Sequence, residues 1–109
     1  MSTALQRRDA DRRKDRIRLW EDTRSELRAA LTEILPGTKV YVFGSLTRPG
    51  VFNARSDIDL ALLNESKDLS VYGLAATLEE RLGRPVDIVL LGRCRFAAKI
   101  LREGELWMS

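Results

Sequence analysis

The 109-residue sequence predicts an α/β (α+β) protein in which a small mixed β-sheet is packed against helices. Three observations lead to this fold class. Apolar residues recur at helical spacing early in the chain, short β-branched runs follow at three places, and a second helical stripe separates the last two runs. The expected order is helix, strand, loop, strand, helix, strand, helix, which favours a mixed sheet covered by helices on one side.

The first expected element is an amphipathic helix over about residues 11–35. Its apolar positions have the spacing of one helix face: Ile17, Trp20, Leu27, Leu31 and Ile34. The helix should end at Pro36-Gly37, because proline cannot extend the hydrogen-bond ladder and glycine permits a turn. We therefore expect Trp20 in the core rather than at an interface.

Strands are expected where β-branched and aromatic residues cluster in runs too short for a helix: Val40 to Phe43, Asp57 to Leu63 and Val86 to Leu91. Glycine, proline and asparagine between the first two runs predict a loop over 44–56, with one helical turn beginning at Ser45. Leu106 to Met108 is expected to add a brief edge strand. Leu106-Trp107 either forms an exposed apolar patch or folds onto the core.

Two further helices complete the expected fold. The first follows capping candidates in Ser66 to Ser70 and ends at Gly83 and Pro85, and its apolar side is formed by Val71, Leu74, Leu78 and Leu82. The second is short and spans Cys94 to Arg102, with apolar positions at Phe96, Ile100 and Leu101.

The length fits a single domain over residues 1–109. The composition, 44% apolar and 32% charged, suits one compact core and excludes a disordered chain. No apolar run approaches the roughly 18 residues that span a bilayer, and no apolar leader follows the amino terminus. We therefore expect a cytoplasmic protein that does not contact membranes.

The charge pattern does not favour nucleic-acid binding, although the net charge is +3. Basic side chains are concentrated before residue 19, but Asp9, Asp11 and Asp15 lie among them, as on a solvated helix. The lone Cys94 excludes an internal disulfide, and the absence of histidine removes the commonest zinc ligand. Any metal should therefore be bound by oxygen, and Cys94 is expected to be a packing residue.

The acidic residues on the expected strands are the strongest functional signal. Asp57 and Asp59 point from the same face of a strand, with Cα atoms about 6.5 to 7 Å apart. Two like charges on one face repel each other, so a cation such as Mg²⁺ is the natural partner. Asp87 is the one charged residue in the third run. Taken alone, it is equally well explained as an edge-strand charge or a partner of Arg84, but with the pair it favours a metal site.

Gly44-Ser45 directly follows a predicted strand. Backbone N–H groups and a serine hydroxyl at the start of a helical turn can bind an anion, and glycine allows close approach of a phosphate. A glycine-serine pair alone usually marks an ordinary turn. Its significance comes from preceding the acidic pair by about a dozen residues.

The whole set, in this order, resembles the minimal nucleotidyltransferases of the DNA polymerase beta superfamily: Gly44-Ser45, Arg48, Gly50, Ser56 to Leu60, and Val86 to Val89. The resemblance implies the nucleotidyltransferase fold, with Asp57 and Asp59 ligating two Mg²⁺ ions. It also implies that Gly44, Ser45 and Arg48 bind the nucleotide. Asp87 would be the third carboxylate, which binds a metal and helps to deprotonate the attacking hydroxyl. Pro49 departs from the family pattern, in which the arginine and glycine are adjacent.

The activity implied by this resemblance is Mg²⁺-dependent transfer of AMP from ATP to a hydroxyl. A chain of this length resembles the antitoxin of HEPN/MNT toxin–antitoxin pairs, which modifies a tyrosine of a HEPN ribonuclease toxin. One alternative is a non-catalytic antitoxin or binding module that neutralises a partner by contact. Another is modification of RNA ends or a small antibiotic. The sequence leaves open the acceptor, the nucleotide preference and the oligomeric state, including a homo-oligomer.

Overall fold

The protein is built around one four-stranded sheet, seen in a computed structural model that describes residues 3–65 and 67–109. The strand order is β3-β2-β1-β4, and the bounds are Lys39–Phe43 for β1, Ile58–Leu62 for β2, Val86–Leu90 for β3 and Glu105–Met108 for β4. β1 pairs antiparallel with β2 and β4, whereas β2 and β3 are parallel. The predicted mixed sheet is confirmed, and β4 is an edge strand, as expected.

Helix α1 spans Ala4–Ile34 and begins seven residues before the expected start near residue 11. The reason is a capping box at its amino terminus. The Thr3 hydroxyl accepts a hydrogen bond from the Gln6 amide, and the Gln6 side chain accepts one from the Thr3 amide. Thr3 and Gln6 have the spacing of this motif, so the sequence contained the signal.

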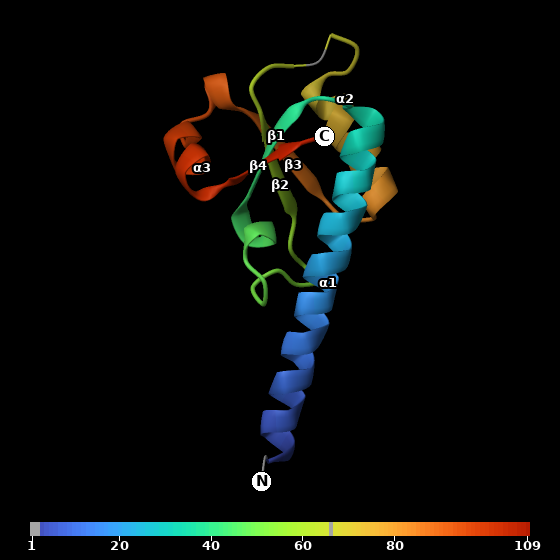
Figure 1. Cartoon of the computed structure of the whole chain (residues 1–109), viewed down its shortest axis with the longest axis vertical. Helices are drawn as coiled ribbons and strands as arrows, with labels where there is room; N and C mark the ends of the chain where they lie inside the picture. Colours follow the sequence, from blue (N-terminus) through green and yellow to red (C-terminus); the bar gives the residue numbers. More distant parts are fainter. Residues whose placement is uncertain (1–2, 66) are drawn as a thin grey trace.

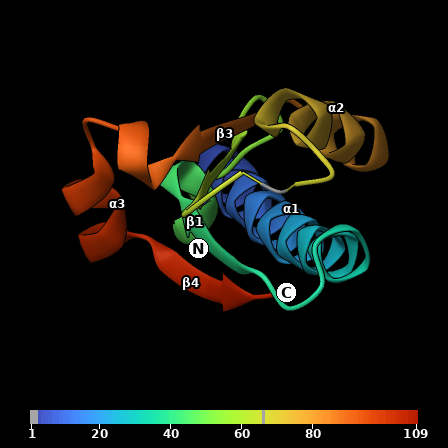
Figure 2. The ribbon, with the colours of Figure 1, turned by 90° about the horizontal axis from the view of Figure 1, so that it is seen from above.

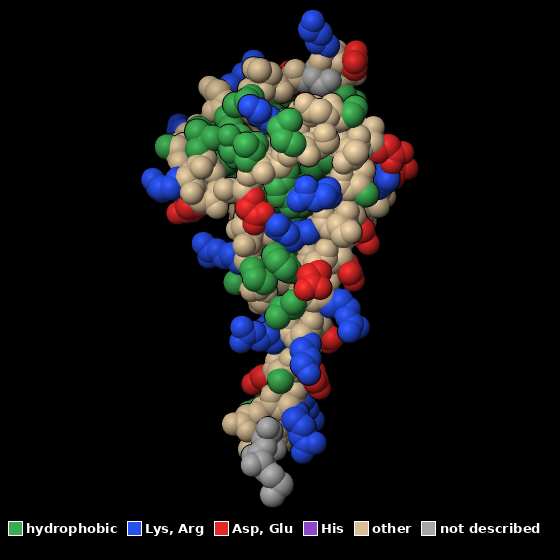
Figure 3. Space-filling view, in the orientation of Figure 1, with side chains coloured by type: hydrophobic (Ala, Val, Ile, Leu, Met, Phe, Trp, Pro, Cys, Tyr) green, Lys and Arg blue, Asp and Glu red, His purple; other side chains and the backbone are tan. Residues whose placement is uncertain are grey.

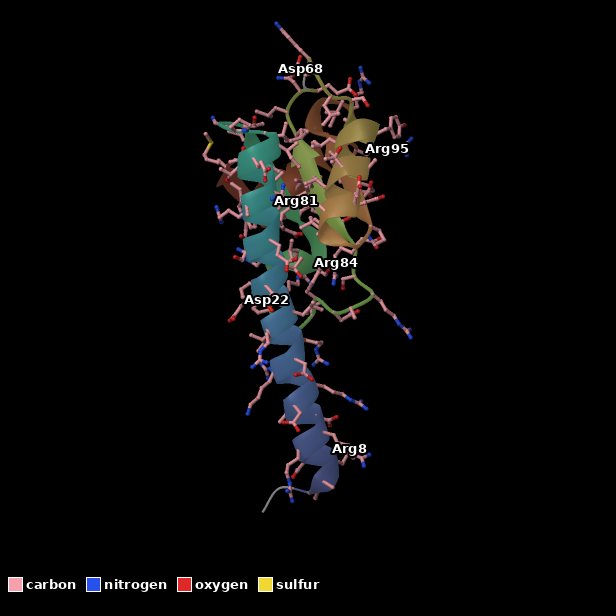
Figure 4. All side chains as sticks on the ribbon, turned by 90° about the vertical axis from the view of Figure 1, so that its right-hand side faces the viewer. Arg8, Asp22, Asp68, Arg81, Arg84 and Arg95 are labelled. Carbon is pink, nitrogen blue, oxygen red and sulfur yellow. The ribbon has the colours of Figure 1, made fainter. Side chains whose placement is uncertain are left out.

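The first half of α1 extends well beyond the sheet (Figure 1), and the molecule measures 58 × 28 × 20 Å. Residues 4–15 are all exposed. Basic and acidic side chains both occur along this projecting part (Figure 3), and Arg8 lies near its free end, far from the sheet (Figure 4). The second half packs on the sheet through Leu27, Ala30 and Leu31.

Helix α2, Val71–Leu82, shares this face with α1. The Ser70 hydroxyl accepts a hydrogen bond from the Gly73 amide and caps the start, and Gly83 ends the helix in the left-handed conformation. Ser66, the other capping candidate, lies outside the described residues. Leu74 and Leu78 enter the main core, on the face of the sheet that α1 also covers.

Helix α3, Ala97–Glu103, covers the opposite face (Figure 2), so the expectation of helices on one side only is wrong. The central strands have apolar side chains on both faces, and both faces therefore need cover. On the α3 face, Ala61, Leu91 and Ile100 form a small second core. The other apolar positions expected for this helix, Phe96 and Leu101, are exposed.

Trp107, on β4, is buried in the main core, whereas its neighbour Leu106 is half exposed. Trp20 is partly buried against the same core, as expected. Among the described residues, no helix has the length and apolar character needed to cross a membrane.

Candidate functional site

The acidic residues singled out in the sequence lie on adjacent strands. Asp59 of β2 and Asp87 of β3 are Cα partners in the parallel register, so their side chains leave the same face of the sheet. Asp57 precedes Asp59 by two residues, just before β2 begins. Asp59 is half-buried, and the other two carboxylates are exposed. The face that they share is the one covered by α3.

The pKa of Asp59 is raised by burial and by its position among the other carboxylates. Burial raises the pKa of Asp59 from its ordinary value to about 6, and the neighbouring carboxylates of Asp87 and Asp57 add to the rise. All three causes penalise the negative charge. A carboxylate in this position is therefore poised to accept a cation or a proton.

Arg84 is the alternative partner that the sequence offers for Asp87. Its guanidinium instead donates hydrogen bonds to the backbone carbonyls of Asn53 (3.2 Å) and Ser56 (2.9 Å), and it lies 4.6 Å from the ring centroid of Phe52. Figure 4 shows Arg84 beside the loop that precedes β2. Arg84 thus holds the loop that leads into Asp57 rather than neutralising Asp87.

The donor atoms fit a hard divalent cation, since all are carboxylate oxygens. Within the part of the chain that the structure describes, no three acidic or cysteine side chains are gathered closely enough to form a complete metal-binding group. The strands thus place the three carboxylates as neighbours without closing them into a ligand set.

The Gly44-Ser45 turn lies directly against Asp59. It forms the start of a 3₁₀ turn, η1, over Gly44–Thr47, one residue earlier than expected. Gly44 has φ +73°, and a Cβ atom at this position would lie 2.3 Å from Oδ2 of Asp59. The position therefore requires glycine for both its backbone conformation and its contact with the carboxylate.

The Pro49 departure from the family pattern is accommodated by a tight turn. The Val51 amide donates a hydrogen bond to the Arg48 carbonyl at 3.2 Å, and Gly50 has φ +85°. Proline followed by glycine at the two central positions is typical of a type II turn. Arg48 remains beside the Gly44-Ser45 turn and lines the same cavity.

Three side chains of α1 that the sequence did not single out for the site fix this loop. Trp20 Nε1 and Arg24 Nη1 donate to the Leu46 carbonyl at 2.7 and 3.0 Å, and Arg16 Nε donates to the Gly50 carbonyl at 2.8 Å. Helical spacing predicted that Trp20 faces the sheet but gave no sign of its acceptor. The contacts span more than 20 residues of sequence, so no local signal reports them.

One cavity of about 840 Å³ joins these features. The Gly44-Ser45 turn, Arg48 and Asp87 line one side of it. The other side is formed by α3 and the residues before it. Its volume lies within the usual range for small-molecule sites. The Gly44-Ser45 turn and Asp87 therefore face one space, whereas Asp57 and Asp59 are not among the residues that line it.

Comparisons with known proteins agree with this geometry. The model of the polymerase beta nucleotidyltransferase family matches residues 25–109. No curated protein matches the chain in sequence.

Three similar solved structures are toxin–antitoxin complexes. A toxin–antitoxin with AMP-PNP has a TM-score of 0.59 and 24% identity, over 78% of this chain and 73% of that one. A tyrosine-to-alanine mutant of MntA-HpeT has a TM-score of 0.57 and 23% identity, over 79% and 72% of the two chains. MntA-HepT has a TM-score of 0.56 and 21% identity, over 82% and 73%. At these identities the likeness shows a shared fold.

Proposed function

The chain belongs to the polymerase beta nucleotidyltransferase family, and we propose that it transfers AMP from ATP to a tyrosine hydroxyl of a HEPN ribonuclease toxin. By this modification it would act as the antitoxin of a cytoplasmic toxin–antitoxin pair. The observation that carries the proposal is the pairing of Asp59 with Asp87 directly beside the Gly44 turn. The likeness to toxin–antitoxin structures supports the choice of partner.

In this proposal, Gly44, Ser45 and Arg48 hold the phosphates of ATP, because a glycine turn exposes backbone N–H donors and an arginine adds positive charge. Asp57, Asp59 and Asp87 hold two Mg²⁺ ions. Bound Mg²⁺ neutralises the charge that develops on the phosphate oxygens. The raised pKa of Asp59 fits this role, because burial and the neighbouring carboxylates of Asp87 and Asp57 disfavour a negative charge that a bound cation would compensate.

The reaction forms a bond between the acceptor oxygen and the α-phosphorus, and breaks the bond from that phosphorus to the oxygen that bridges to the β-phosphate. Pyrophosphate leaves with the electron pair of the broken bond. The Asp87 carboxylate takes the proton of the acceptor hydroxyl, since its exposed side chain lines the cavity in which the acceptor meets ATP. No side chain of the protein forms a covalent intermediate.

The test is to co-express the chain with the protein encoded beside it and to analyse that protein by mass spectrometry. We expect AMP on a tyrosine of the co-expressed protein with the parent chain, and unmodified protein with Asp57→Ala or Asp59→Ala. Growth of the cells reports whether the toxin is neutralised. A partner that is unmodified yet neutralised equally by all three chains would contradict the proposal and indicate neutralisation by contact.

A further inference from the structure

The cavity beside Asp87 has a second wall that the phosphate and metal sites do not use. Helix α3 and the segment before it supply this wall: Cys94, Phe96, Lys99, Ile100 and Glu103. Phe43 and Val89 of the sheet form the adjoining surface. Apolar side chains also gather on the molecular surface over α3 (Figure 3). This wall combines apolar side chains, such as Phe96 and Ile100, with the charged side chains of Lys99 and Glu103.

We infer that the α3 wall holds the nucleobase of the nucleotide, with Phe96 against the face of the base. The inference rests on the proposed function, because it assigns the rest of the same substrate. A triphosphate at Gly44-Ser45 places the covalently attached nucleoside inside the same cavity of about 840 Å³. An apolar wall suits a planar base and does not suit phosphate.

Phe96 is the residue on which recognition depends most. It is 66% exposed although it lines the cavity, so most of its ring is free to be covered by a ligand. Ile100, one turn further along α3, is buried and fixes the helix to the sheet. Aromatic rings bind nucleobases by stacking, with little dependence on the identity of the base.

Lys99 and Glu103 provide the polar part of the wall. They are four residues apart on α3 and therefore lie on the same side of the helix. One is a hydrogen-bond donor and the other an acceptor, and the edge of a nucleobase presents both kinds of group. A tyrosine acceptor has a single hydroxyl, which must lie at Asp87 in the proposed reaction, so these two side chains favour the base as the occupant of the wall.

The acceptor has another route to Asp87. A smaller cavity of about 300 Å³ lies between α2 and β3, and Asp87 borders it as well as the larger one. Tyr72 and Ala75 of α2 line this smaller cavity. An acceptor hydroxyl that approaches from the α2 side reaches Asp87 without crossing the α3 wall. Because β3 is an edge strand, the acceptor can enter the larger cavity at Asp87 over this edge while the base lies on the α3 wall.

The test compares a ligand that has a base with one that lacks it. We would measure by calorimetry, in excess Mg²⁺, the binding of AMP-PNP and of inorganic tripolyphosphate to the full chain. Phe96→Ala should raise the Kd for AMP-PNP about 10-fold and leave the Kd for tripolyphosphate unchanged. Phe96→Trp should retain AMP-PNP binding. Leu101→Ala is the matched control, since Leu101 is 52% exposed on α3 and does not line the cavity.

The possible outcomes separate this inference from the proposed function. If the parent binds neither ligand, the proposed function fails and the inference fails with it. If the parent binds both but Phe96→Ala binds AMP-PNP as tightly as the parent, or loses both ligands equally, only the inference is overturned. Unchanged AMP-PNP binding with slower modification of the acceptor protein would assign the wall to the acceptor. Thermal unfolding of each variant tests whether its fold is intact.

Discussion

Two charged clusters in this protein differ in whether their charges are compensated. In the arginine–glutamate cluster, Arg24 donates to both carboxylate oxygens of Glu105, at 3.1 and 2.6 Å, and its guanidinium lies 4.8 and 5.1 Å from the ring centroids of Trp20 and Trp107. In the carboxylate cluster, the charges that act on Asp59 are the like charges of Asp87 and Asp57.

The two clusters shift carboxyl pKa values in opposite directions. The hydrogen bond from Arg24 lowers the pKa of Glu105, whereas burial raises the pKa of Asp59 to about 6. The first cluster stabilises the fold and holds the Leu46 carbonyl in place. In the second, burial and like charge disfavour the ionised form of Asp59, directly beside the Gly44 turn. Charge kept at a cost in stability is typical of functional sites.

The largest expected effect is on the rate of AMP transfer, which should depend on the carboxylate cluster and not on the arginine–glutamate cluster. Asp59→Asn removes a negative charge that the proposed reaction needs, so the rate of AMP transfer should fall about 10³-fold. Glu105→Gln should keep most of the activity because it leaves the cavity intact. Asp22→Asn, on the exposed side of α1, is the control for loss of a carboxylate. Comparable rates for Asp59→Asn and the parent in a pyrophosphate-release assay would remove the distinction between the clusters.

A second test probes the contact between Asp59 of the carboxylate cluster and the Gly44-Ser45 turn. Gly44→Ala places a methyl group against Asp59 and should lower the rate of transfer about 10²-fold. Gly83→Ala is the matched control, because Gly83 has a similar φ of +68° but nothing within 4 Å of an added Cβ atom. It should lose about 1 kcal/mol of stability and retain activity. Equal activity of the two variants would show that the contact is unimportant.

Substitutions in the arginine–glutamate cluster should lower the free energy of unfolding. Arg24→Met removes the ion pair, the hydrogen bond to Leu46 and two aromatic contacts, so the free energy of unfolding should fall by about 2 kcal/mol. Arg28→Met is the comparison, because Arg28 is exposed, lies over the Trp107 ring and acts on Glu105 more weakly than Arg24 does. Urea denaturation of both variants measures the difference, and a larger loss for Arg28→Met would contradict the assignment.

The smallest effect is a pair of opposite pH dependences. The folded-state pKa of Glu105 is lowered, so its contribution is present above its unfolded value of about 4.5 and is lost as the pH falls. The folded-state pKa of Asp59 is raised, so its penalty develops as the pH rises from about 4 to 6. In EDTA, as the pH rises from about 4 to 6, Glu105→Gln should therefore become less stable relative to the parent, and Asp59→Asn should become more stable relative to the parent. Each change should be at most about 1 kcal/mol, because both groups are partly solvated.

Much of the fold follows from local sequence signals. Alternation on β2 separates Ile58 and Leu60, which enter the core, from Asp59, whose side chain leaves the opposite face of the sheet. Turn residues such as Gly83 mark where a helix ends. The spacing of Asp57 and Asp59 is sufficient to place them on one face. Such signals operate over a few residues and need no knowledge of the tertiary fold.

The features that sequence reasoning missed depend on long-range packing. The pair Arg24–Glu105 is separated by 81 residues, and nothing near either residue identifies its partner. The face that α3 covers depends on apolar residues of strands distant in sequence, such as Ala61. Phe96 has an apolar side chain at helical spacing, which predicts burial, but the short helix buries Ile100 instead. The α3 wall could therefore not be anticipated.

The most direct measurement is thermal unfolding of the parent and Asp59→Asn at pH 8, each in EDTA and in excess Mg²⁺. If the carboxylate cluster is a strained cation site, the variant unfolds at a higher temperature than the parent in EDTA. Mg²⁺ then raises the unfolding temperature of the parent and leaves that of the variant unchanged. A variant that is less stable than the parent in EDTA, or a parent that does not respond to Mg²⁺, would contradict the account.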